Sequence, residues 1–135
     1  MESSEQVGLS VRVSYRQPIP QAASGAVLFA FQLEETRRRW ESLFNPLLPD
    51  DALRRFRDHA DEVRSRRVEL TPSMFVAGVT DISAPVLRGG AAAAALTVPY
   101  LERRQPVHSP AEVAEMVLAT AAKIAEQLVQ SDERL

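Results

Sequence analysis

The 135-residue chain contains no cysteine, which excludes disulfide bonds, thiolate catalysis and cysteine-ligated metal sites. Long apolar runs are also missing, because the longest stretches, 26–31 and 91–96, are far too short to span a bilayer. The net charge of −2 is not that of a general nucleic-acid binder. Residues 1–6 are polar and acidic, without the apolar segment of a signal peptide. We therefore expect a cytoplasmic protein without a membrane segment.

The motifs of the common enzyme classes are missing as well. The two histidines, His59 and His108, have no partner at metal-ligand spacing. Ser24 does not lie in a G-x-S-x-G sequence, and neither common type of glycine-rich phosphate loop occurs. We therefore expect no catalytic activity, no cofactor and no metal ion.

The most informative stretch of the chain is a predicted β-hairpin. Within residues 78–86, the apolar residues Ile82, Ala84 and Val86 alternate with Asp81, Ser83 and Pro85. This period of two residues is typical of a half-buried strand. Gly89 and Gly90 supply the positive φ angles of a two-residue turn. The return strand, 91–98, places Ala93, Ala95 and Thr97 on one face. Small side chains there leave space for something above the sheet.

The rest of the chain predicts one domain, 7–132, after a disordered N-terminal end, 1–6. Strands are expected at 7–14 and 68–70, and helices at 21–31, 34–44 and 50–67. The expected core residues of the second and third helices are Trp40, Leu43 and Phe44, and Leu53, Phe56, Ala60 and Val63.

A long C-terminal helix is predicted from a capping box. Ser109 is the N-cap, Pro110 takes the first helical position, and Glu112 reaches back to the cap. An apolar stripe follows at helical spacing: Val113, Val117, Ala121, Ile124 and Leu128. Together these elements predict an α+β domain, with a largely antiparallel sheet and helices packed beside it.

Arginines gather on the second and third predicted helices, at 37–39, 54–57 and 64–67. Contact with nucleic-acid phosphates is one interpretation. Acidic residues are interleaved with them, however, in pairs at helical spacing such as Asp50–Arg54 and Asp51–Arg55. This pattern favours solvated helix faces.

Several segments, in the same order, resemble the C-terminal effector-binding domain of the IclR family of bacterial transcription factors. They are the hairpin pattern G-V-x-x-I-x-A-P-V at 78–86, the A-A-L-T-V sequence at 94–98, and the segments 16–19, 22–25 and 27–31. The resemblance covers roughly residues 7 to 128. It implies a GAF/PAS-like curved antiparallel sheet with flanking helices, in a truncated form without the helix-turn-helix. It also implies a homodimer or homotetramer that contacts DNA only through an N-terminal domain not present in this chain.

The resemblance further implies a site for a small organic effector. Its residues would be Ala22, Ser24, Gly25, Met74, Asp81, Thr97 and Pro99. Four positions depart from the family. Asp81 and Pro99 stand where the family often has an uncharged residue and a hydroxyl donor, and Ala22 and Ala26 stand where it often has a threonine and a lysine or arginine. These departures speak against a glyoxylate- or pyruvate-like acid, because a carboxylate facing the site repels an anion unless it is protonated or paired. The pocket could instead suit an aromatic or cationic effector, or it could be unused.

Structural alternatives apply to the same residues. Gly25 could serve only close packing against the sheet, Asp81 could face outward, and Met74 and Phe75 could tuck into the core. The rival function is a stand-alone GAF-like dimerisation or interaction module without a small ligand. The two functions differ in whether the space over Ala93, Ala95 and Thr97 is open or is filled by Phe29, Met74 or Phe75.

Overall fold

The computed structural model describes residues 16–73 and 76–133. The expected strand at 7–14, the N-terminal end and Met74 lie outside these ranges. Along the chain the elements are the 3₁₀-helix η2 (Ile19–Gln21), α1 (Ala23–Ala30), α2 (Glu34–Phe44), α3 (Asp50–Arg66), β1 (Glu69–Pro72), β2 (Val79–Arg88), β3 (Ala91–Leu101) and α4 (Pro110–Glu133). The described strands form one antiparallel sheet in the order β1-β2-β3. The mixed α+β fold with a long C-terminal helix is as predicted.

The predicted hairpin is confirmed. Gly89 and Gly90 have φ angles of 61° and 80°, the left-handed region that the short turn between β2 and β3 requires. The register shifts beside the turn, since Val86 pairs with Ala94 whereas Leu87 pairs with Ala92. Ala93 is therefore the extra residue of a β-bulge.

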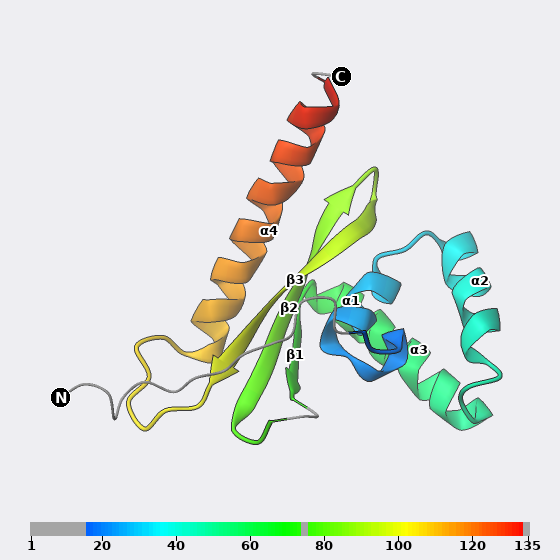
Figure 1. Ribbon diagram of the computed structural model, residues 1–135, viewed down its shortest axis with the longest axis horizontal. Helices are drawn as coiled ribbons and strands as arrows, with labels where there is room; N and C mark the ends of the chain where they lie inside the picture. The colour runs from blue at the N-terminus through cyan, green and yellow to red at the C-terminus, as the bar shows by residue number, and fades with distance from the viewer. Residues whose placement is uncertain (1–15, 74–75, 134–135) are drawn as a thin grey trace.

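The expectation that β2 is half-buried is wrong in the middle of the strand. Ile82 to Val86 are all buried, so neither face of β2 meets solvent there. The reason is tertiary: α4 packs on one face of the sheet and α1 on the other, and both contact β2 (Figure 1). Two covered faces bury both sets of alternating residues.

The C-terminal helix begins and packs as its sequence predicts. The Glu112 N–H donates to Ser109 Oγ and the Ser109 N–H donates to Glu112 Oε1, each at 3.2 Å. The apolar stripe of α4 then packs against the sheet residues Ile82, Ala84 and Val86. These contacts form one of the two hydrophobic cores that the described residues build.

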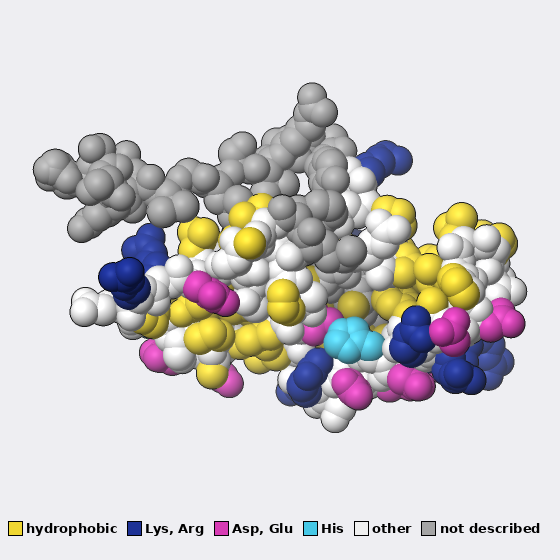
Figure 2. All heavy atoms as spheres, turned by 90° about the horizontal axis from the view of Figure 1, so that it is seen from below, with side chains coloured by type: hydrophobic (Ala, Val, Ile, Leu, Met, Phe, Trp, Pro, Cys, Tyr) yellow, Lys and Arg dark blue, Asp and Glu magenta, His cyan; other side chains and the backbone are white. Residues whose placement is uncertain are grey.

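Charged side chains cover the outer surface of α2 and α3, where basic and acidic groups alternate (right part of Figure 2). The predicted pair Asp51–Arg55 is present with an N···O distance of 2.6 Å, and Arg57 links α3 to Glu41 of α2 at 2.7 Å. Among the ion pairs of the described residues, Asp50–Arg54 does not occur. The acidic neighbours offset much of the positive charge that a phosphate-binding face would need.

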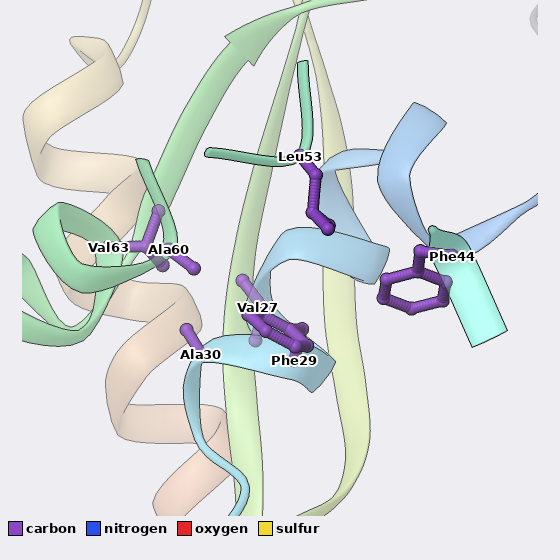
Figure 3. Close-up of a cluster of buried hydrophobic side chains, with 7 residues drawn as sticks. All are labelled: Val27, Phe29, Ala30, Phe44, Leu53, Ala60 and Val63. Atoms are coloured by element: carbon purple, nitrogen blue, oxygen red, sulfur yellow. The ribbon is translucent and has the colours of Figure 1, made fainter. Parts of the chain in front are cut away.

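The second core lies between the first three α-helices and the sheet, around Phe29 (Figure 3). Its buried members are Val27, Phe29, Ala30, Phe44, Leu53, Ala60 and Val63. The predicted core side of α3 is confirmed. On α2, Trp40 and Phe44 pack against this core, but Leu43 is 66% exposed, so its predicted burial is wrong. Arg37 is buried instead, because positions 37, 40 and 44 share one helical stripe.

Candidate functional site

The antiparallel register places polar residues in two rows on one face of the sheet. Residues paired directly across antiparallel strands project from the same face. The first row is Glu69, Ser83 and Thr97, and the second is Thr71, Asp81 and Pro99. Ala95, two residues from Thr97, packs against the core around Phe29. These six residues therefore lie on the sheet face opposite the one that α4 packs against, with Pro99 exposed at its far end, and we call them the polar face.

Two hydroxyl groups meet in the first row. Ser83 Oγ lies 2.9 Å from Thr97 Oγ1, a hydrogen bond in which either group can donate. Ser83 is fully buried and Thr97 is partly buried. Each hydroxyl retains acceptor capacity beyond this bond.

Glu69 carries a carboxylate that is almost entirely buried, with 1% of the residue exposed. Oε2 is hydrogen-bonded to His59 Nε2, which α3 supplies. Oε1 has no hydrogen-bond partner among the described residues, and Arg66 Nη2 approaches it only to 3.6 Å. A buried carboxylate oxygen without a hydrogen bond costs free energy, so this atom is a candidate ligand-binding group.

Asp81 lies in the second row and is partly buried. The described residues offer it no ion pair or side-chain hydrogen bond. Burial alone raises the pKa of its carboxyl above the ordinary value. Asp81 shares its sheet face with Ser83 but is paired with the exposed Pro99, so the predicted alternative of an outward-facing side chain stays open.

The start of α1 holds the other predicted site residues. Ala22 is the N-cap and provides no side-chain hydrogen bond, and Ser24 is partly exposed. A Cβ added to Gly25 would lie 1.9 Å from the carbonyl oxygen of Ile19. Gly25 is thus needed for close packing, as the structural alternative held, but against the backbone of η2 rather than against the sheet. No hydrogen bond among the described residues joins this end of α1 to Asp81, Thr97 or Pro99.

Two alanines of β3, Ala93 and Ala95, lie in different surroundings. Ala95 packs against the core around Phe29, while Ala93 is exposed. The turn end of β3 is tied to the end of α1, since the Ala92 N–H donates to the Phe31 carbonyl at 2.8 Å and Gln32 Nε2 donates to the Ala92 carbonyl at 2.9 Å. The polar face therefore starts beyond Ala95, away from the turn.

Three residues around the polar face were missed in the sequence: Glu69, Ser83 and His59. A usable signal for Glu69 was present, since a single charged residue stands between Val68 and Leu70 in a predicted strand. Period-2 alternation places it opposite the apolar pair. Its bond to His59 could not be predicted, because it depends on how α3 lies against β1.

Two other kinds of site are not found within residues 16–73 and 76–133. No group of three or more histidine, aspartate and glutamate side chains is arranged to hold a metal ion. No helix there is both long enough and apolar enough to cross a membrane.

No protein-family model matches the sequence, and no curated protein matches it. Solved structures do. An IclR homologue from Microbacterium hydrocarbonoxydans, complexed with 4-hydroxybenzoate, aligns with a TM-score of 0.65 and 23% identity over 94% of this chain and 52% of its own. HmgR of Pseudomonas aeruginosa aligns with a TM-score of 0.65 and 27% identity over 90% of this chain and 49% of its own.

A third structure is the inducer-binding domain of the PobR transcription factor from Acinetobacter, a double mutant in complex with 3-hydroxybenzoic acid. It aligns with a TM-score of 0.67 and 23% identity over 90% of this chain and 75% of its own. The chain thus spans about half the length of several of the regulators that it matches, and more of the isolated domains. Its fold is that of the C-terminal domains of IclR-type and related transcriptional regulators.

Proposed function

We propose that the chain is the effector-binding and oligomerisation domain of an IclR-type transcriptional regulator. The observation that carries this proposal is the polar face, where the register brings hydroxyl and carboxylate groups together on one side of the sheet. The fold supports it, because two structural neighbours were solved with hydroxybenzoates bound.

The mechanism would be a shift between two arrangements of subunits. An effector bound at the polar face favours the arrangement for which it has the higher affinity, and it shifts the equilibrium only by that difference. The site residues are Ser24, Gly25, Ala22, Met74, Asp81, Thr97 and Pro99, with Glu69 and Ser83 added from the register. DNA binding would be done by a domain that these 135 residues do not include. The chain alone should therefore give no sequence-specific shift in a gel-retardation assay at moderate salt.

A thermal-shift screen against aliphatic acids, aromatic acids, amines and sugars tests the effector role. A ligand at about 100 times its dissociation constant adds roughly 2.7 kcal/mol of stability. For a domain of this size that raises the melting temperature by several degrees. Thr97→Val should abolish the rise because it removes a hydroxyl from the polar face. Thr120→Val, at an exposed position of α4, is the matched control.

A ligand-free interaction module is the second candidate, and the contact of Ala95 with the core around Phe29 favours it. That contact fills part of the space that small residues would otherwise leave. A well-folded sample that responds to no ligand class, yet forms a defined homodimer or homotetramer in size-exclusion chromatography with light scattering, would support this second candidate instead.

A further inference from the structure

We infer that the effector of this domain carries a protonated amine, where the ligands named for the structural neighbours carry a carboxylate. This inference rests on the proposed function and specifies the ligand class of the same site. It is argued from the charges and the unused acceptor atoms of the polar face.

The first step is the composition of the two rows. Among their six residues are two carboxylates, Glu69 and Asp81, and no lysine, arginine or histidine. Glu69 is the direct partner of Ser83, and Asp81 is two residues from Ser83, so the carboxylates are diagonal neighbours on adjacent strands. Such positions are about 7–8 Å apart, close enough for both to act on one ligand.

The second step is the acceptor capacity that remains unused. Glu69 Oε1 is buried and has no hydrogen-bond partner among the described residues, and Asp81 has no ion pair there. The hydroxyl groups of Ser83 and Thr97 are hydrogen-bonded to one another, and their oxygens still have lone pairs that can accept a further hydrogen bond. An ammonium group has three donors and no acceptor, so it fits a surface of this kind.

The third step concerns the basic side chains that approach from neighbouring elements. His59 and Arg66 of α3 both face Glu69, at Oε2 and Oε1 respectively. Arg64 donates to the carbonyl groups of Ala30 and Gln32. Within the described residues the two arginines and His59 approach Glu69 or backbone carbonyls, and Asp81 has no basic side chain as a partner. A carboxylate ligand would meet a negative charge at Asp81, whereas an amine would meet a counter-ion.

The test uses two probes that share a ring and a hydroxyl group and differ in the sign of their charge. Binding of 4-hydroxybenzylamine and of 4-hydroxybenzoate to the full chain would be measured by isothermal titration calorimetry. We expect the amine to bind at least tenfold more tightly than the acid. Asp81→Asn should weaken amine binding at least tenfold, and Asp58→Asn, which removes an exposed carboxylate of α3, should change it less than twofold.

Glu69→Gln is the second variant, with circular dichroism to establish that it folds, and it should also weaken amine binding. Tighter binding of 4-hydroxybenzoate would overturn the amine inference while supporting the effector role. Amine binding that survives both Asp81→Asn and Glu69→Gln would place the ligand elsewhere and overturn the inference too. Binding of neither probe would also reject it, and the thermal-shift screen across the other ligand classes would then decide the effector role separately.

Discussion

The guanidinium group of Arg37 lies over the ring of Phe29, with 4.7 Å between Cζ and the ring centroid. Its Nη2 also donates to Asp61 Oδ1 of α3 at 2.8 Å. Arg37 belongs to a cluster of arginines whose sequence pattern favours solvated helix faces, yet its side chain is 10% exposed. This one arginine therefore joins α2 to the core that α1 and α3 build.

Arg37→Ala should lower the free energy of unfolding by about 2 kcal/mol, because it removes the contact with Phe29 and the packing of the aliphatic stem. Arg38→Ala, one residue along the helix, removes only an exposed pair with Glu34 and should cost less than about 0.5 kcal/mol. Urea denaturation measures both. Equal effects at the two positions would contradict the role assigned to Arg37.

Gly25→Ala should destabilise the protein by about 1–3 kcal/mol or more, although alanine is the better helix former. The new methyl group would collide with the Ile19 carbonyl, which is backbone and cannot move away alone. Ser24→Ala, in the same turn of α1, is the control and should be nearly neutral. A melting temperature of Gly25→Ala equal to or above that of the parent protein would contradict the close packing of η2 on α1.

Asp81→Asn should stabilise the ligand-free protein modestly at neutral pH. Burial raises the pKa of Asp81 above its unfolded value of 3.8, so ionisation disfavours the folded state. This cost is negligible well below pH 3.8, where both states are protonated, grows as the pH rises from 3.8 to the higher folded pKa, and is constant above it. The gain in the variant should therefore vanish in acid. The free energy of unfolding of both proteins would be measured from pH 3 to 8. A gain in the variant that does not change with pH would contradict the ionisation of Asp81 as its cause.

Arg67→Gly should stabilise the protein by about 0.5–1 kcal/mol. Arg67 follows α3 with a φ of 72°, a left-handed conformation that glycine adopts without strain. Ser65→Gly, inside the same helix at an exposed position, should instead destabilise by roughly 0.5 kcal/mol. Chemical denaturation of the two variants should give opposite signs, and a loss of stability in Arg67→Gly would refute the strain argument.

Much of the secondary structure could be predicted because its signals are local. The hairpin follows from Gly89 and Gly90, and the start of α4 from Ser109 and Glu112, since turn and cap chemistry involve residues only a few positions apart. The predicted range of α2, 34–44, is also the observed one, although its N-cap, Leu33, makes no side-chain hydrogen bond.

The candidate site could be predicted only in part. Resemblance to a family pointed to Asp81, Thr97 and Pro99, and the register places all three on one sheet face. Glu69 was missed although its place between Val68 and Leu70 was a usable signal, whereas its bond to His59 depends on how α3 lies against β1. The predicted function of Gly25 as a ligand contact now competes with a steric role against Ile19.

By itself, the sequence of this protein determined where most helices and strands run, because periodicity and capping act within one element. The tertiary structure alone decided which sides of those elements meet. It buried both faces of β2 between α1 and α4, brought Arg37 over Phe29, and joined His59 to Glu69. Contacts of this kind depend on the packing of whole elements against one another, and the free energy of that packing is shared by residues far apart in the chain.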